Sequence, residues 1–242
     1  MINKNILKEI ENPVVKIWSI YDRINNLSYE NNTEVHTKRV LFIFDDHYTA
    51  MGVRNLVAML GPVHLRAHKW DDAKMMIDNN FLPDIIIWAV LSDENRSSVY
   101  QHAFTLLKKL KYVQQIIIDD SVPQMFTGAN GFINRVTFLC FGAPVSDFRK
   151  ILSHVFSLRE TKENFCLFKR LTKRQFYILS RLASGSSKKN LAQELTVTTK
   201  TIEAHYYQIK LVLDIRKKLH EAWVLRTLSI LLKTNPAFLN TF

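Results

Sequence analysis

The chain has 242 residues, of which 47% are hydrophobic and 23% charged, a composition typical of a folded soluble protein with a sizeable core. No apolar stretch approaches the roughly 20 residues that cross a bilayer, and the opening "MINKNILKEI" lacks the apolar core of a signal peptide, so we expect a cytoplasmic protein. The net charge of +11 is concentrated in residues 159–242, where sixteen Lys and Arg face six Asp and Glu, which favours a polyanionic partner, most often nucleic acid, over a merely solubilising surface.

Residues 1–37 are predicted to form a helical N-terminal extension. Asn12 and Pro13 suit the N-cap and first position of a helix. Apolar residues then recur at three- and four-residue spacing, which is typical of an amphipathic helix: Val14, Ile17, Tyr21 and Ile24. Such a helix can pack on its own domain or contact a second subunit, and the sequence leaves both alternatives open.

Residues 38–158 alternate between strand-like and helix-like patterns. The strand-like segments are short apolar runs at 39–44, 63–67, 85–90, 115–119 and after Gly128. The helix-like segments are 49–60, 71–80, 98–110 and 145–158. Five β/α units of this size predict an α/β fold, a doubly wound parallel sheet with helices on both faces.

The segment "LPDIIIWAVLSD", residues 82–93, contains the most apolar of these runs. An uninterrupted apolar run is typical of a strand that is buried on both faces of the sheet. Ligand chemistry in such sheets lies just beyond the carboxyl ends of the strands. Ala89 and Val90 stand at that end, so this strand carries no reactive side chain there.

After a charged linker, residues 159–170, the pattern becomes wholly helical. Thr172 and Gln175 form a capping box before the first helix, and Gly185 suits a left-handed stop after it. Ser187 is placed to cap a short second helix. A third helix is predicted over 199–213 and a fourth over 220–232. Residues 171–242 are therefore expected to form a small all-α domain.

The stretch "LTKRQFYILSRLASGSSKKNLAQELTVTTKTIEAHYYQIKLVLDI", residues 171–215, resembles the LuxR/NarL-type helix-turn-helix DNA-binding domain. The positions that carry the resemblance are Leu171, Thr172, Arg174, Ile178, Leu179, Gly185, Ala192, Leu195, Val197, Thr201, Ile202 and His205. The resemblance implies that the helix at 199–213 enters the major groove of double-stranded DNA and that its amino-terminal residues contact base edges.

Carried over by position, the resemblance also implies which side chains face the DNA. Glu203 can accept a hydrogen bond from cytosine N4, and Ala204 can contact a thymine methyl group. The lysines and hydroxyls beside them are placed for phosphate contacts, although a single lysine is more often only a solvated surface charge. The predicted DNA-binding set is Lys188, Lys189, Thr198, Lys200, Thr201, Glu203, Ala204, Tyr207 and Lys210.

The sequence departs from the family pattern in two ways. Leu211 and Val212 stand where basic residues are common, which weakens phosphate binding at that end of the helix and leaves an apolar surface that a partner domain could cover. Asp214 replaces a usual glycine, and aspartate tolerates the left-handed turn that this position requires better than most residues.

Residues 38–158 resemble the receiver domain that commonly precedes such DNA-binding domains. Asp45 and Asp46 match the acidic pair, Ala89 falls on the phosphoacceptor aspartate and Asp119 on the Thr/Ser position. The lysine position falls on Arg135, or on Asn134 if the register slips by one. Phosphoryl transfer needs a carboxylate nucleophile, which Ala89 removes. The resemblance therefore implies a pseudo-receiver that acts without phosphorylation.

Three acids remain at this degenerate site. Asp45, Asp46 and Asp119 are expected to crowd one edge of the sheet, where like charges repel one another. An ion pair with Arg135 is favoured over a retained divalent cation, and a relic with solvated acids is a further alternative. We expect no resident metal and no cofactor.

These observations predict a bacterial transcription regulator that is dimeric on DNA, and not an enzyme. The alternative is a heterodimer partner or sequestering protein that modifies another regulator of this type. An enzyme built on the acidic edge lacks a nucleophile. Cys140 and Cys166 have no CxxC or Cys/His partner spacing, which favours isolated thiols over a disulfide.

Overall fold

The computed structural model describes residues 37–70, 72, 83–89, 92–110, 112–133, 135–157 and 167–236. The predicted N-terminal extension, the predicted helix at 71–80 and most of the predicted linker lie outside the described residues. The chain divides into two compact units, residues 1–37 and residues 38–242.

One six-stranded sheet lies in the first half of this unit, with the strand order β2-β1-β3-β4-β6-β5. Five strands run parallel, and the edge strand β5 is antiparallel to β6. The strands are β1 (Lys38–Phe44), β2 (Val63–Lys69), β3 (Ile85–Ala89), β4 (Gln114–Asp119), β5 (Gly128–Ile133) and β6 (Val136–Cys140). This confirms the predicted α/β fold with a doubly wound parallel sheet.

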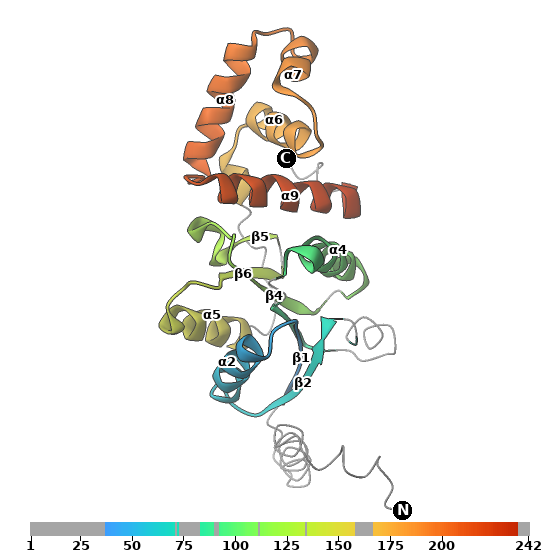
Figure 1. The fold of residues 1–242 in the computed structure, drawn as a ribbon, viewed down its shortest axis with the longest axis vertical. Helices are drawn as coiled ribbons and strands as arrows, with labels where there is room; N and C mark the ends of the chain where they lie inside the picture. Colours follow the sequence, from blue (N-terminus) through green and yellow to red (C-terminus); the bar gives the residue numbers. More distant parts are fainter. Residues whose placement is uncertain are drawn as a thin grey trace, which may run out of the picture. The chain divides into compact units, whose positions relative to one another are not determined.

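Helices cover both faces of the sheet (Figure 1). On one face, α2 (His47–Ala58) and α5 (Val145–Ser157) pack on the alternate side chains of the central strands. On the other face, α4 (Asp93–Lys109) packs on the remaining alternate side chains. Strand β3 is buried along its whole length, and its apolar side chains pack against the helices on both faces of the sheet, as the sequence predicted.

The last parallel strand differs from the sequence prediction. The run after Gly128 forms β5, whereas the fifth parallel strand is β6, which pairs with β4. A turn at Arg135, where φ is 66°, reverses the chain between the two strands. The short 3-10 helix η2 (Gln124–Phe126) precedes them. The strand that the sequence placed in the fifth position is thus an antiparallel edge strand.

Residues 167–236, the described part of the second half of the unit, contain four α-helices. They are α6 (Lys173–Ala183), α7 (Lys188–Glu194), α8 (Thr199–Val212) and α9 (Lys218–Thr234), preceded by the 3-10 helix η3 (Leu167–Arg170). The predicted capping box is present, because the side chains of Thr172 and Gln175 each accept a hydrogen bond from the other's backbone N–H. Gly185 has the expected positive φ, 92°.

The two halves of this unit share one hydrophobic core. Buried side chains of β3, α4, β4 and β6 belong to the same cluster as those of α6, α8 and α9. The main contact across the halves is between α4 and α9. Within the described residues, no helix is both long and apolar enough to cross a membrane.

Candidate nucleic-acid interface

Two capped helices, α7 and α8, form the corner of the helix-turn-helix. The Ser187 hydroxyl accepts from the Asn190 backbone N–H at 3.1 Å and begins α7. Between the helices, Thr196 takes a positive φ of 53°, and the Thr198 hydroxyl then accepts from the Thr201 backbone N–H at 3.1 Å. These local hydrogen bonds fix where α8 begins, and therefore which residues its first turn presents.

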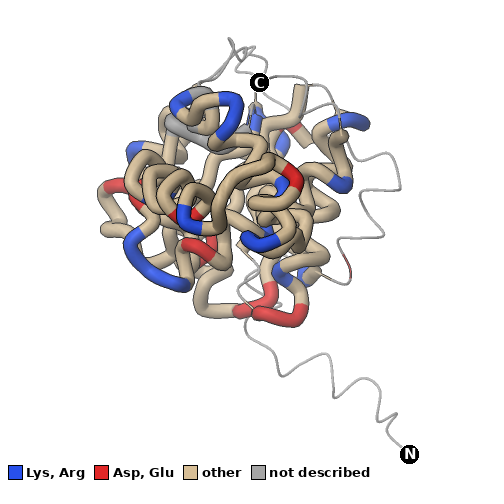
Figure 2. The backbone as a smooth tube through the Cα atoms, turned by 90° about the horizontal axis from the view of Figure 1, so that it is seen from above, with Lys and Arg blue, Asp and Glu red and all other residues tan. Residues whose placement is uncertain are grey.

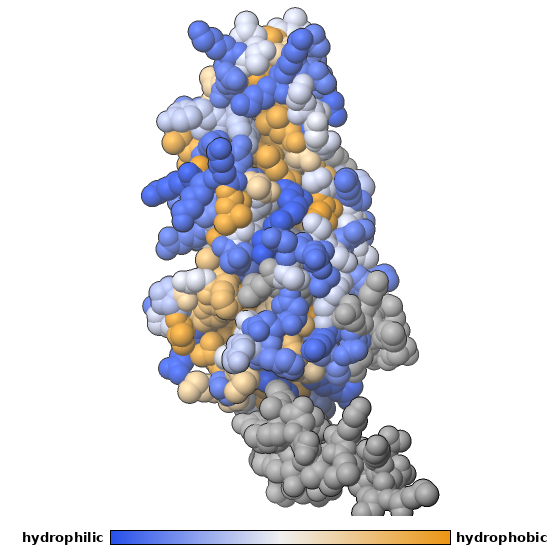
Figure 3. All heavy atoms as spheres, viewed as in Figure 1, coloured by the Kyte–Doolittle hydropathy of each residue, from blue (hydrophilic) through white to orange (hydrophobic). Residues whose placement is uncertain are grey.

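Helix α8 has one buried and one exposed side. Ile202, Tyr206 and Ile209 are buried against the domain core. The exposed side carries Thr199 and four of the predicted DNA-contacting residues: Lys200, Glu203, Ala204 and Tyr207. The upper end of the molecule, which α8 shares with α7, is largely hydrophilic (Figure 3). Lys210, which was predicted to lie on the same face, is only partly exposed.

Lys188 and Glu203 contact each other across the corner. Their Nζ and Oε1 atoms are 3.9 Å apart, and both side chains are about half exposed. The Lys188 ammonium also lies 5.3 Å from the ring centroid of Tyr206. The pair is weak, because solvent screens charges at this exposure. Lys188 therefore does not hold Glu203 firmly in one place.

Lys210 is held against α9. Its Nζ donates to Glu221 Oε2 at 3.1 Å, and Glu221 Oε1 accepts from the Tyr206 hydroxyl at 2.7 Å. Burial, followed by the bond to Glu221, raises the pKa of Tyr206 well above its ordinary value, so this hydroxyl remains a donor. Of the predicted DNA-contacting lysines, Lys210 is thus more firmly engaged within the protein than the exposed Lys189 and Lys200.

The carboxyl end of α8 shows both departures from the family pattern. Leu211 is 56% exposed, whereas Val212 packs on the hydrophobic core. Asp214 has a positive φ of 48°, the left-handed turn that its position predicted. Its Oδ1 accepts from Arg216 Nε at 2.6 Å. The apolar surface at this end is therefore mainly Leu211 and not the Leu211–Val212 pair.

The basic and acidic positions along the backbone are marked in Figure 2, which looks down on the end of the molecule that carries α7 and α8. In this view Lys and Arg occur in several separate segments of the backbone. In the second half, Lys and Arg occur on α6, α7 and α9 as well as on α8.

The acids of the receiver-like half have separate partners. Asp46 caps α2, where its Oδ2 accepts from the Thr49 N–H at 2.7 Å. Hydrogen bonds from Thr49 hold the pKa of Asp46 below its ordinary value. Asp45 Oδ2 accepts from the Ser92 N–H at 2.8 Å. Ala89, between them and β4 in the sheet, is fully buried and offers no nucleophile.

Asp119 is the most buried of these acids, with 1% of its surface exposed. Its Oδ1 accepts from the backbone N–H and the hydroxyl of Ser121, at 2.8 and 2.5 Å. Its Oδ2 accepts from the Tyr100 hydroxyl at 2.7 Å. Among the described residues, no group of three or more His, Cys, Asp or Glu side chains could hold a metal ion. Each of the three acids thus accepts hydrogen bonds from its own donors.

The expected ion pair between Arg135 and these acids was wrong. The Arg135 guanidinium donates to the backbone carbonyls of Leu107, at 2.7 Å, and Leu110. It therefore binds the last turn of α4. The physical reason is its place in the topology: Arg135 precedes β6 and lies at the amino edge of the parallel sheet, whereas the acids lie at the carboxyl edge.

Sequence reasoning missed the cations that Asp119 does have. Arg96 on α4 has its NH1 atom 3.7 Å from Asp119 Oδ1, and Arg226 on α9 has its NH2 atom 3.9 Å from Oδ2. Arg96 is itself buried inside an otherwise polar stretch of helix. That placement depends on the packing of α4, so the only signal in the sequence was an arginine on the apolar side of the helix.

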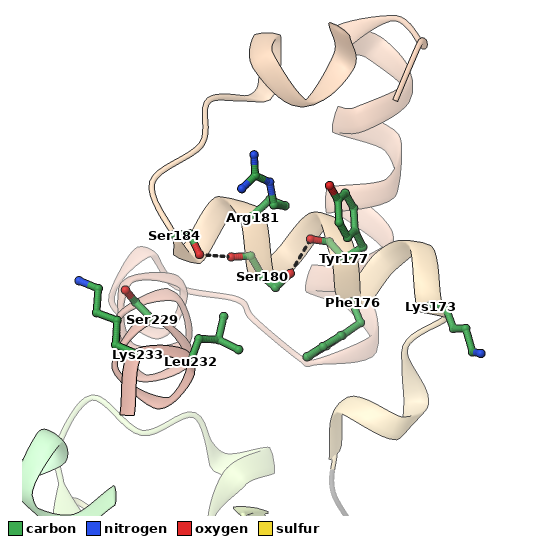
Figure 4. A pocket seen from close by; sticks show the side chains of 9 residues that line it. All are labelled: Lys173, Phe176, Tyr177, Ser180, Arg181, Ser184, Ser229, Leu232 and Lys233. Carbon is green, nitrogen blue, oxygen red and sulfur yellow. Dashed lines mark hydrogen bonds between the residues drawn. The ribbon is translucent and has the colours of Figure 1, made fainter. Parts of the chain in front are cut away.

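A groove of about 620 Å³ lies between α6 and α9 (Figure 4). Phe176 and Leu232 supply its apolar lining. The Ser180 and Ser184 hydroxyls donate to carbonyls of their own helix, those of Tyr177 and Ser180, at 2.8 and 2.9 Å. None of the predicted DNA-contacting residues lines the groove, so it is separate from the candidate interface.

Comparison with known proteins identifies the class of the second half. Residues 169–222 match the family described as bacterial regulatory proteins, luxR family. This segment contains α6, α7 and α8, and it is a LuxR-family helix-turn-helix domain. No curated protein is significantly similar to the chain in sequence.

Solved structures of response regulators are similar to the chain at low sequence identity. RcsB from Salmonella enterica serovar Typhimurium, bound to the promoter P1flhDC, is 14% identical, with 81% of this chain and 99% of that chain covered and a TM-score of 0.47. RcsB in a structure of two dimers bound to two parallel DNAs is 15% identical, with 83% of this chain and 100% of that chain covered and a TM-score of 0.46. The response regulator ChrA of a heme-sensing two-component system is 18% identical, with 79% of this chain and 96% of that chain covered and a TM-score of 0.34.

Proposed function

We propose that the protein is a transcription regulator that binds double-stranded DNA as a dimer and acts without phosphorylation of its receiver-like half. The observation that carries the proposal is the exposed side of α8 in a LuxR-family domain. It presents Lys200, Glu203, Ala204 and Tyr207 together, from the capped first turn onward. A helix of this kind reads base edges with its amino-terminal residues.

The charge of the second half supports DNA as the partner. Residues 159–242 carry sixteen Lys and Arg and six Asp and Glu. Lys189 and Lys200 are exposed and flank the corner between α7 and α8. Phosphate contacts from such positions orient a protein on the duplex without reading its sequence. Glu203 adds a group that discriminates, because the negative field of the duplex repels it unless a base amino group donates to it.

Independence from phosphorylation is supported by the carboxyl edge of the sheet. Ala89 ends β3 without a nucleophile, and Asp45 and Asp46 are engaged by backbone N–H groups. A phosphoryl group therefore has no acceptor at the position that the receiver resemblance implies.

The test is DNA selection followed by binding measurements. The purified chain is incubated with a library of randomised duplexes, and the selected site is measured by fluorescence anisotropy, with stoichiometry from sedimentation. We expect a two-fold symmetric site, two chains per duplex and loss of affinity in Lys200→Ala. Lys173→Ala, an exposed lysine on α6 outside the interface, is the matched control. No enriched sequence, or equal losses in both variants, would contradict the proposal.

A further inference from the structure

An aromatic cluster joins the two halves of the described unit. Trp223 of α9 is fully buried, and its ring centroid lies 5.2 Å from that of Phe126 and 5.2 Å from that of Phe138. Both phenylalanines belong to the receiver-like half. Tyr100 of α4 completes the cluster, at 6.5 Å from Trp223. A buried tryptophan of the DNA-binding half thus packs within the core of the other half.

A chain of hydrogen bonds runs from this tryptophan to Asp119. Trp223 Nε1 donates to the Tyr100 hydroxyl at 2.8 Å, and that hydroxyl donates to Asp119 Oδ2 at 2.7 Å. Burial, followed by the nearby Asp119 charge, raises the pKa of Tyr100 well above its ordinary value, so the hydroxyl keeps its proton. The direction of both bonds is therefore fixed.

The Asp119 carboxylate is buried and lies near one guanidinium from each half. Arg96 of α4 approaches one oxygen at 3.7 Å, and Arg226 of α9 approaches the other at 3.9 Å. Taking a charge out of water is costly unless opposite charges and hydrogen bonds replace the solvent. For Asp119, part of the interaction that replaces solvent comes from Arg226 of α9. The burial of this carboxylate is consequently coupled to the seating of α9.

We propose that Asp119 is a positioning residue for DNA binding: through Tyr100–Trp223 and through Arg226 it holds α9, and with α9 the helix-turn-helix, in one place on the receiver-like half. This inference rests on the proposed function. The main contacts of α8 are with α6 and α7, so this seating is compatible with an exposed recognition helix. The degenerate receiver thereby has a structural use that requires no phosphoryl group.

Two indole groups provide the test and its internal control. The Trp223 N–H reports the seating of α9, whereas the Trp88 N–H donates to Gln115 Oε1 at 2.9 Å inside the receiver-like half alone. Exchange of both indole protons with deuterated solvent is followed by nuclear magnetic resonance in the full chain. The Trp223 signal is assigned by its loss in Trp223→Phe.

In Asp119→Asn we expect the Trp223 indole to exchange about ten to a hundred times faster, the range for loss of a hydrogen bond to a charged group, and the Trp88 indole to keep its rate. Asp120→Asn is the matched control, because Asp120 is 55% exposed and pairs with Arg96. If Asp119→Asn does not fold, Arg226→Gln must give the same selective increase. Equal acceleration of both indoles, or no difference between Asp119→Asn and Asp120→Asn, overturns the proposal.

The same variants then bind DNA. Asp119→Asn should weaken binding to the two-half-site duplex while leaving the preferred bases and the affinity for a single half-site unchanged, because a fixed geometry favours simultaneous engagement of two sites. An equal loss on both duplexes would contradict a positioning role. If the wild-type chain binds no DNA, the proposed function fails, and indole exchange still decides whether Asp119 seats α9.

Discussion

Glu203 is the residue whose chemistry most directly tests base recognition. In Glu203→Ala we expect the preferred site to lose roughly 1–3 kcal/mol of binding free energy, the range for a good base contact, with non-specific binding unchanged or slightly stronger. The reason is that a carboxylate in the negative field of the duplex is tolerated only where a base amino group donates to it. Wild type and variant are compared on a randomised site library and on random DNA.

The structure supplies the competing explanation for Glu203. Its carboxylate lies 3.9 Å from Lys188 Nζ, and an exposed pair of this kind is worth about 0–1 kcal/mol. If pairing is its only role, Glu203→Ala in a Lys188→Ala background has no further effect on specificity. An unchanged preferred sequence, with an unchanged margin over random DNA, would show that Glu203 reads no base.

Asp46 offers a second test at this scale, because its role is local. Its side chain caps α2 through the Thr49 N–H, so Asp46→Ala should reduce the free energy of unfolding by about 1 kcal/mol. Hydrogen bonding lowers the pKa of Asp46 in the folded chain. The charged form's contribution is therefore present above the unfolded pKa and is lost as the pH falls through the folded pKa. Denaturant unfolding of the wild type and of Asp46→Ala, at neutral pH and near pH 3, measures the difference in the free energy of unfolding. A retained metal-binding role would not produce this difference.

At the scale of single elements, α7 and α8 should act as one phosphate-binding corner. Replacing Lys188 or Lys200 with Ala should weaken binding to all DNA sequences alike and reduce the slope of log affinity against log salt by about 0.9 for each lost phosphate contact. Lys233→Ala, at the exposed end of α9, is the control and should leave the slope unchanged. Salt titrations in which Lys188→Ala and Lys200→Ala keep the wild-type slope would remove these lysines from the interface.

Elements whose signals are local could be predicted from the sequence. The caps at Thr172 and Ser187, the stop at Gly185 and the doubly buried run of β3 each depend on a few neighbouring residues. Contacts between distant residues could not be predicted in this way. Trp223 and Tyr100 are 123 residues apart, and no periodicity in either helix indicates that their side chains meet.

Arg135 shows the same limit at the degenerate receiver site. The sequence suggested a lysine-like role at the carboxyl edge, but the identity of the fifth parallel strand decides which edge a residue occupies. Because β5 is antiparallel, Arg135 comes to lie at the opposite edge, beside the end of α4. The direction of one strand thus decides that Arg135 contacts the end of a helix and not the acids.

At the scale of the whole molecule, the receiver-like half should be chemically inert toward phosphoryl donors. Incubated with acetyl phosphate and Mg²⁺, the chain should gain no phosphoryl group, and its affinity for the selected DNA site should stay the same. The reason lies in the combination of positions at the carboxyl edge. Ala89 has no nucleophile, Asp119 is 1% exposed and hydrogen-bonded to Tyr100 and Ser121, and Asp46 serves as an N-cap.

Intact-mass measurement under conditions that preserve acyl phosphates checks whether the chain gains a phosphoryl group, and fluorescence anisotropy with and without the donor checks whether its DNA affinity changes. An acid-labile mass increase of one phosphoryl group, mapped to an acid of this edge and accompanied by a change in DNA affinity, would show that control by phosphorylation persists without an aspartate at position 89.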